Sequence, residues 1–253
     1  MARVLCLAGH DPSGGAGVDA DREALERFGV EAVCVVTART EQEGGRVRSI
    51  TPVRCETWWR EARRAAEEPL AALKTGLLCD AEQVRAVVRL LGDLEPLPVV
   101  VDPVLAASGG EPFLDEAGIE ALLGELLPCA VVLTPNLREA ARLGGFALDE
   151  LQAVPAARVG AARALLERGA AAVLVKGGHG TEDPVVDLLL EPGGDPLYLT
   201  HRRVPGAGLH GSGCRFASAL AAGLARGRPL PAAAAEAGAW LAERIAAASG
   251  RRA

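Results

Sequence analysis

Residues 98–134, PVVVDPVLAASGGEPFLDEAGIEALLGELLPCAVVLT, give the clearest indication of the fold class. This stretch holds two valine-rich runs, at 98–104 and 130–134, with a helical pattern at about 115–126 between them. The first run shows no alternation of polar and apolar residues, so both faces of that strand are predicted to be buried. A strand, a helix and a second strand in this order indicate a parallel sheet with helices on both faces.

The same rhythm continues on either side of this stretch. Further strands are predicted at 3–8, 32–38, 73–78 and 171–178. Further helices are predicted at about 18–28, 56–67, 81–91, 156–168, 214–226 and 231–248, and one opens after Pro135. Residues 183–204 break the rhythm, because two apolar runs flank EPGGD and predict a β-hairpin. The chain has no repeat and no linker, so a single domain over residues 1–253 is predicted.

The composition is that of an ordinary globular protein. Of the 253 residues, 49% are hydrophobic and 24% are charged, which argues against disorder, collagen and coiled coil. The net charge of −6 argues against a nucleic-acid partner, which needs a basic face. We expect no membrane partner, because no apolar stretch approaches ~18 residues. The six cysteines form no CxxC pair and the start resembles no signal peptide, so a cytoplasmic protein with reduced thiols is expected.

Five polar or glycine-rich segments follow predicted strands. They are GHDPSGGAG (9–17), TARTEQ (37–42), DPVLAASGG (102–110), TPNLREA (134–140) and KGGHG (176–180). Open α/β sheets bind ligands beyond the carboxyl ends of their strands. The five segments therefore predict one ligand site at that edge of the sheet.

A sixth segment, PGAGLHGSGC (205–214), leads into a helix expected to start near Cys214. Gly211 and Gly213 flank Ser212 there, and glycine lets backbone N–H groups approach a ligand closely. The N-terminus of the helix adds partial positive charge. These features predict an anion hole for a phosphoryl group in transfer. The alternative is a glycine-rich helix entry that binds nothing.

Lysine is rare in this chain, which has only Lys74 and Lys176 beside 25 arginines. Lys176 closes a predicted buried strand just before Gly177 and Gly178. Lysine serves phosphates as a point charge, so Lys176 predicts a phosphate contact. The alternative is a lysine at the sheet edge whose amino group reaches the solvent.

Acidic and amide side chains supply the other candidates. Asp21 either is a surface carboxylate favoured by the helix dipole or points into a pocket. Asp102 ends a buried strand and needs a cation, an arginine or backbone N–H groups as its partner. Asn136 and Glu139 share one helix face, where they either hold water around Mg²⁺ or cap the helix. Spacing alone leaves these alternatives open.

In order along the chain, AGHDPSGGAGVDAD, VTARTEQ, LKTGLL, VVVDPV, TPNLREA, VKGGHG and HGSGC resemble motifs of one enzyme family. The chain resembles, nearly end to end, the hydroxymethylpyrimidine and phosphomethylpyrimidine kinases of thiamine biosynthesis, in the ribokinase-like superfamily. The resemblance implies a three-layer α/β/α fold with a mostly parallel central sheet and a small β lid. It implies ATP-dependent phosphorylation of 4-amino-5-hydroxymethyl-2-methylpyrimidine and/or its monophosphate, with Mg²⁺ as cofactor. It also implies a possible homodimer, because family members are often dimers.

The resemblance also assigns roles to residues of this chain. Positions that contact the pyrimidine are matched by Gly9, Asp21, Gln42 and Val104. Positions linked to ATP phosphates and Mg²⁺ are matched by Asn136, Glu139 and Lys176, with Asp102 and Glu139 as the expected metal ligands. The expected catalytic residues are Lys176, Gly211, Gly213 and Cys214. The helix N-terminus is expected to lower the pKa of the Cys214 thiol, which then accepts the hydroxyl proton.

The chain departs from the family pattern in several places. Residues 106–110 read AASGG where the family has a lysine, and residues 215–217 read RFA where small polar residues are usual. His10 replaces a serine or threonine, and Gly208 and Leu209 replace polar residues. Two other functions therefore stay open. One is a pyridoxal or pyridoxamine kinase, and the other is a non-catalytic pyrimidine-binding paralogue.

Overall fold

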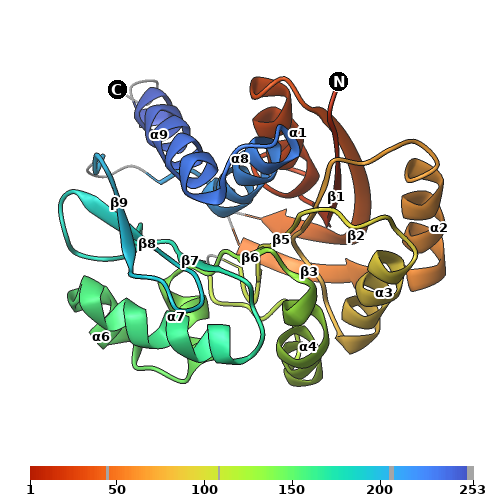
Figure 1. Cartoon of the computed structure of the whole chain (residues 1–253). Helices are drawn as coiled ribbons and strands as arrows, with labels where there is room; N and C mark the ends of the chain where they lie inside the picture. The colour runs from red at the N-terminus through yellow and green to blue at the C-terminus, as the bar shows by residue number, and fades with distance from the viewer. Residues whose placement is uncertain (44–45, 108, 205–207, 250–253) are drawn as a thin grey trace.

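The computed structural model of the chain describes residues 1–43, 46–107, 109–204 and 208–249, without the side chains of residues 42, 43 and 46. The described strands form one sheet in the order β3-β2-β1-β4-β5-β6-β7-β8-β9 (Figure 1). They are β1 Arg3–His10, β2 Glu31–Glu43, β3 Arg46–Pro52, β4 Ala72–Thr75, β5 Val99–Val101, β6 Val132–Leu133, β7 Val173–Val175, β8 Val185–Leu190 and β9 Leu197–His201. Neighbours from β2 to β7 pair in parallel, whereas β3, β8 and β9 run antiparallel to their neighbours. The predicted α/β fold with a mostly parallel sheet is confirmed.

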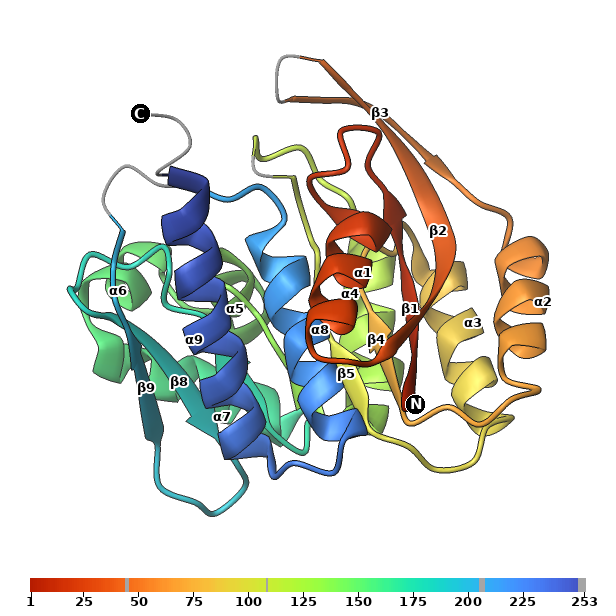
Figure 2. The same ribbon diagram turned by 90° about the horizontal axis from the view of Figure 1, so that it is seen from above.

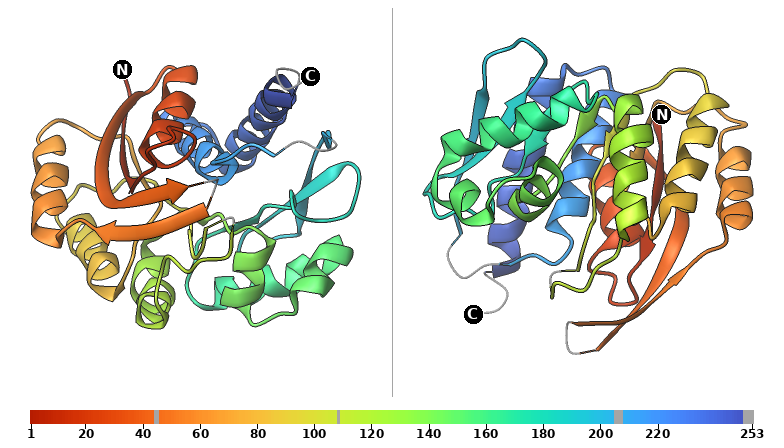
Figure 3. Two further views of the ribbon diagram at one scale, coloured as in Figure 1. Left: turned by 180° about the vertical axis from the view of Figure 1, so that it is seen from behind. Right: turned by 90° about the horizontal axis from the view of Figure 1, so that it is seen from below.

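Helices cover both faces of this sheet, which makes three layers (Figures 1 and 2). One layer consists of α1 Gly17–Arg27, α8 Ser212–Ala225 and α9 Leu230–Ser249. The opposite layer consists of α2 Cys55–Ala65, α3 Ala81–Gly92, α4 Glu116–Ala121, α5 Leu137–Gly144, α6 Leu148–Ala153 and α7 Arg158–Glu167. Figure 3 shows the second layer from below, with the sheet behind it.

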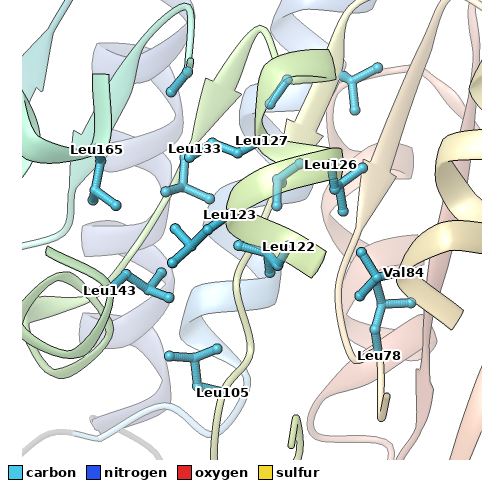
Figure 4. Packing of buried hydrophobic residues seen from close by; sticks show 14 of the residues in the cluster. Leu78, Val84, Leu105, Leu122, Leu123, Leu126, Leu127, Leu133, Leu143 and Leu165 are labelled. Atoms are coloured by element: carbon cyan, nitrogen blue, oxygen red, sulfur yellow. The ribbon is translucent and has the colours of Figure 1, made fainter. Parts of the chain in front are cut away.

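Alternate residues of the central strands pack against the two layers. In β1, Leu5 and Leu7 belong to the core cluster shared with α2 to α7, while Val4 and Cys6 belong to the cluster shared with α1, α8 and α9. All four side chains are fully buried. Figure 4 shows part of the first cluster, where leucines that follow α4 pack together with Leu133 of β6. Two buried faces explain why these strands lack polar alternation.

The largest departure from the sequence prediction lies at the β3 edge of the sheet. The strand predicted at 32–38 was expected to end in a loop, but residues 39–43 continue β2, whose outer half pairs with β3. The strand β3 and the helix α6 were not predicted. Residues 39–43 are mostly polar because this hairpin projects beyond the apolar core (Figure 2), so their composition is typical of a loop.

The helix expected at 115–126 is α-helical only over α4. It continues as a π-helical turn, Leu122–Leu126, and a 3₁₀ turn, Leu127–Cys129.

All six cysteines are free. None of the helices that the structure describes is long and apolar enough to span a membrane.

Candidate active site

A cleft of about 1010 Å³ lies at the carboxyl ends of the parallel strands. One end is lined by Gly9, His10 and Thr40 of β1 and β2, and by Val104 and Phe113 of the loop that follows β5. The other end, at the β8–β9 side, is lined by Val185, His201, Leu241, Ala242 and Ile245. We call these the acceptor end and the donor end, after the two substrates that the family resemblance implies. Asp102, Lys176 and the first turn of α8 also line the cleft, from elements that lie between the two ends.

Lys176 and Asp102 form an ion pair in the middle of the cleft. The Lys176 Nζ lies 2.8 Å from Asp102 Oδ1, and the two side chains are 13% and 3% exposed. Lys176 follows β7 and Asp102 follows β5, so the topology brings together residues that are 74 positions apart. Burial alone would lower the pKa of Lys176, but the carboxylates of Asp102 and Glu139 raise it above its ordinary value. The ammonium group therefore stays charged at the cleft wall.

Asn136 and Glu139 cap the helix α5. The Asn136 Oδ1 accepts hydrogen bonds from the N–H groups of Arg138 and Glu139, at 2.9 and 3.1 Å. In return, Glu139 Oε2 accepts from the Asn136 N–H at 2.7 Å, which completes a capping box. The capping alternative is thus confirmed, yet both residues also line the cleft. Burial raises the pKa of Glu139 to about 7; Lys176 opposes this shift and Asp102 adds to it.

The helix α8 begins at Ser212, two residues before the position expected from the sequence. Gly211 is its N-cap with φ 74°, and a Cβ on Gly211 would overlap the carbonyl oxygen of Gly15. A Cβ on Gly213 would lie 3.2 Å from Lys176 Nζ. Gly213 and Cys214 occupy the first turn, where N–H groups have no acceptor within the helix. Gly213 therefore lets the first turn of α8 approach the Lys176 amino group closely.

The Cys214 thiol is not the acidic thiol that was expected. Burial raises its pKa to about 11; Lys74 and a hydrogen bond from the Gly17 N–H lower it, while Asp21 and Asp102 raise it. The prediction that the helix N-terminus lowers this pKa is wrong, because desolvation and the two carboxylates outweigh the dipole. At neutral pH the thiol carries its proton.

Asp21 lies beneath the cleft and does not line it. Its carboxylate is fully buried, with Lys74 Nζ at 2.9 and 3.1 Å and the Ser218 hydroxyl at 2.8 Å. The alternative of a surface carboxylate is therefore wrong, and the structure does not bring Asp21 into the pocket. Burial alone would lower the pKa of Lys74, but the Asp21 carboxylate raises it. The sequence analysis did not predict that Lys74 is the buried partner of Asp21, although the scarcity of lysine marked it.

The remaining predicted pyrimidine contacts lie at the acceptor end. Gly9 is the second-last residue of β1, where a Cβ would lie 2.5 Å from the Leu77 side chain, and Val104 lines the wall after β5. Gln42 lies in β2 opposite Val47, and its side chain is outside the described residues. Gly206, part of the glycine-rich segment before α8, is also outside them.

Two residues at the donor end carry no motif and were not predicted. The His201 Nε2 lies 3.1 Å from Asp187 Oδ2, and Asp187 Oδ1 accepts from the Gly177 N–H at 2.7 Å. A Cβ on Gly238 of α9 would overlap the His201 ring. The hairpin β8–β9 is thereby held against both the Lys176 loop and α9.

The described part of the chain contains no group of three or more His, Cys, Asp or Glu side chains that could hold a metal ion alone. Asp102 and Glu139 nevertheless both line the cleft, and the Asp102 charge adds to burial in raising the pKa of Glu139. Mg²⁺ in phosphoryl-transfer sites takes one or two carboxylates, with substrate phosphates and water as its other ligands. The pair of carboxylates fits that requirement.

Comparisons with known proteins identify relatives over nearly the whole chain. A model of the family described as phosphomethylpyrimidine kinase matches residues 11–252. A hydroxymethylpyrimidine/phosphomethylpyrimidine kinase from Streptomyces coelicolor is 37% identical over 231 residues, which is 91% of this chain and 83% of that protein. A phosphomethylpyrimidine kinase structure from Clostridium difficile has a TM-score of 0.79 at 27% identity, covering 97% of this chain and 100% of its own. A Staphylococcus aureus pyridoxal kinase with AMP-PCP and pyridoxal has a TM-score of 0.85 at 28% identity, with coverages of 97% and 88%.

Proposed function

The chain belongs to the phosphomethylpyrimidine kinase family, and from this premise we propose how its cleft carries out the phosphoryl transfer. The enzyme is a kinase of thiamine biosynthesis that phosphorylates 4-amino-5-hydroxymethyl-2-methylpyrimidine and/or its monophosphate with ATP. The observation that carries the proposal is the meeting of Lys176 Nζ with the first turn of α8, between the two ends of one cleft.

The two substrates would enter from opposite ends. The pyrimidine would bind at the acceptor end against Gly9 and Val104, with Gln42 on the β2–β3 hairpin as a further contact. The adenosine of ATP would bind at the donor end between β8–β9 and α9, and its γ-phosphate would face Lys176 and Gly213. The hydroxymethyl oxygen then attacks the γ-phosphorus from the acceptor side. The new O–P bond forms as the bond to the β,γ-bridging oxygen breaks, ADP leaves, and the hydroxyl proton passes to solvent.

Catalysis here rests on charge placement. The transferring phosphoryl group spreads negative charge over its oxygens, and little activation of the nucleophile is required. Lys176 supplies a fixed positive charge, and the N–H groups of Gly213 and Cys214 donate hydrogen bonds to the oxygens. Asp102 and Glu139 would hold Mg²⁺ through water, and the bound ion would neutralise phosphate charge.

The wider setting is also a proposal. We place the enzyme in the cytoplasm, because its donor is ATP and its six cysteines are free. We expect one cooperative domain over residues 1–253, since one sheet joins the described strands. A homodimer is the expected assembly, and sedimentation equilibrium would measure it.

A direct assay tests the function. ADP release should be measured with the hydroxymethylpyrimidine, with its monophosphate and with pyridoxal, each at saturating Mg-ATP. Pyridoxal is included because pyridoxal kinase structures share the fold at 27–30% identity. We expect kcat/KM to be highest for one of the two pyrimidines. Turnover of pyridoxal alone, or binding of a pyrimidine without ADP release, would contradict the proposal.

Cys214→Ala distinguishes the backbone role of this residue from a role of its thiol as a base. A thiol with a pKa of about 11 is protonated at neutral pH, and alanine keeps the backbone N–H. We expect kcat to fall less than about tenfold, whereas removal of a general base costs about 10²–10⁴-fold. Wild type and variant should also show parallel kcat profiles between about pH 7 and pH 9. A 10²-fold loss, or profiles that diverge as pH rises, would restore the thiol as the base.

A further inference from the structure

Two loops from opposite ends of the sequence touch at the acceptor end. We call residues 11–16 the acceptor loop and residues 208–211 the anion loop. The His210 Nε2 lies 2.7 Å from Asp11 Oδ2, and a Cβ on Gly15 would lie 2.7 Å from the His210 ring. A Cβ on Gly211 would likewise overlap the backbone of the acceptor loop, at Gly15 and Ala16. The pyrimidine side and the phosphoryl side of the cleft therefore share one loop contact.

Arg215, in the first turn of α8, forms hydrogen bonds to both of these loops. Its Nη1 donates to the carbonyl oxygens of Gly15 at 2.7 Å and His210 at 2.8 Å, one in each loop. The residue is only 4% exposed, so these hydrogen bonds are shielded from water. A single guanidinium group thus holds the acceptor loop and the anion loop at a fixed separation.

The other edge of the guanidinium is oriented by Glu23 of α1. Arg215 Nε and Nη2 both donate to Glu23 Oε2, at 2.8 and 2.6 Å. The second oxygen of Glu23 accepts from Arg244 Nε of α9 at 2.6 Å. The helix α9 also lines the donor end through Leu241, Ala242 and Ile245. The chain Arg215–Glu23–Arg244 therefore connects both loops to the wall of the donor end.

We propose that Arg215 is a positioning residue for phosphoryl transfer, which sets the acceptor loop and the N-terminus of α8 at the spacing that in-line attack requires. The inference rests on the proposed function, because it assigns the acceptor and the transferred phosphoryl group to these two sides of the cleft. Arg215 does not itself line the cleft. Its effect passes through the backbone of Gly15 and His210.

The expected effect follows from the geometry of the reaction. A misplacement of about 1 Å between reacting groups can cost about 10²-fold in rate. The planar guanidinium offers donors in a rigid fork that faces both the loops and Glu23, and an ammonium group cannot reproduce it. The loss should therefore appear in kcat, while ATP, which binds Lys176 and the donor end, keeps its affinity.

The test compares Arg215→Ala, Arg215→Lys and the control Arg228→Ala. Arg228, in the turn between α8 and α9, forms a surface ion pair with Glu236 of α9 at 3.8 Å and does not line the cleft. We expect Arg215→Ala to lower kcat about 10²-fold with the ATP KM changed less than about threefold. Arg215→Lys should fall between Arg215→Ala and wild type, and Arg228→Ala should match wild type. Amide hydrogen exchange should speed up in residues 11–16 and 208–214 of Arg215→Ala but not of Arg228→Ala.

A folded Arg215→Ala variant with kcat within about threefold of wild type would overturn the proposal, as would unchanged exchange in both loops. If Arg215→Ala does not fold, Glu23→Gln replaces it, because glutamine keeps the shape and removes the charge that orients Arg215. The Glu23→Gln variant should lower kcat about three- to tenfold and speed up hydrogen exchange in both loops. A wild-type kcat in this variant, together with faster exchange in the loops, would also overturn the proposal. An inactive wild-type enzyme would contradict the proposed function instead. Hydrogen exchange in the two loops would still show whether Arg215 holds them together.

Discussion

Replacing Lys176 by alanine is expected to lower kcat by about 10²–10³-fold and to raise the KM for ATP. The Nζ of Lys176 lies at the first turn of α8, so its charge acts where the transferred phosphoryl group would stand. Alanine removes this charge and leaves the Asp102 carboxylate, which is 3% exposed, without its cation. Negative charge on Asp102 would then repel the phosphates of ATP.

The measurement is steady-state kinetics in both substrates, with Lys176→Met as the companion variant. Methionine keeps most of the apolar stem and lacks the charge, so it should be nearly as slow as alanine. Thermal unfolding of both variants checks that the lost rate does not follow from unfolded protein. An effect confined to the KM for the pyrimidine would place Lys176 at the acceptor end and contradict the assignment.

Asp21→Ala is expected to lower the free energy of unfolding by about 3–5 kcal/mol, because it leaves the buried Lys74 ammonium without a counter-ion. Lys74 and Asp21 are both fully buried, and Ser218 also loses its acceptor. The variant should require less urea to unfold. At a temperature where it stays folded, its KM for the pyrimidine should be close to that of wild type, since Asp21 does not line the cleft.

The double variant Asp21→Asn, Lys74→Met is the control for this prediction. It removes both charges, so most of the lost stability should return, because a buried ion pair can often be replaced at little cost. A stable Asp21→Ala variant with a raised pyrimidine KM would show that the carboxylate contacts the substrate, as the family resemblance implied.

Much of the fold follows from local patterns in the chain. Valine-rich runs without alternation mark β5 and β6, and the same pattern marks β7, because a strand buried on both faces must be apolar throughout. The outer half of β2 and all of β3 were not predicted. They form a hairpin at the edge of the sheet, where β3 pairs only with β2. The polar residues of this hairpin have the composition of a loop, and only the pairing of the two strands identifies them as strands.

Local patterns also predicted which segments form the cleft. Its wall includes residues from 9–17, 102–110, 134–140, 176–180 and the described part of 205–214. This worked because the carboxyl ends of parallel strands meet at one edge. The partners of individual side chains could not be predicted from the sequence. Asp21 meets Lys74 across 53 positions, and Arg215 meets Gly15 across 200.

The chemical state of these groups depends on contacts that form only when the chain folds. The sequence shows a helix N-terminus beside Cys214, which favours a lowered pKa, but burial and two distant carboxylates raise that pKa to about 11. Periodicity and spacing are properties of neighbours along the chain, and they place elements and glycines well. Desolvation and charge pairing depend on every group packed around a side chain, and those groups come from elements that only the folded chain brings together.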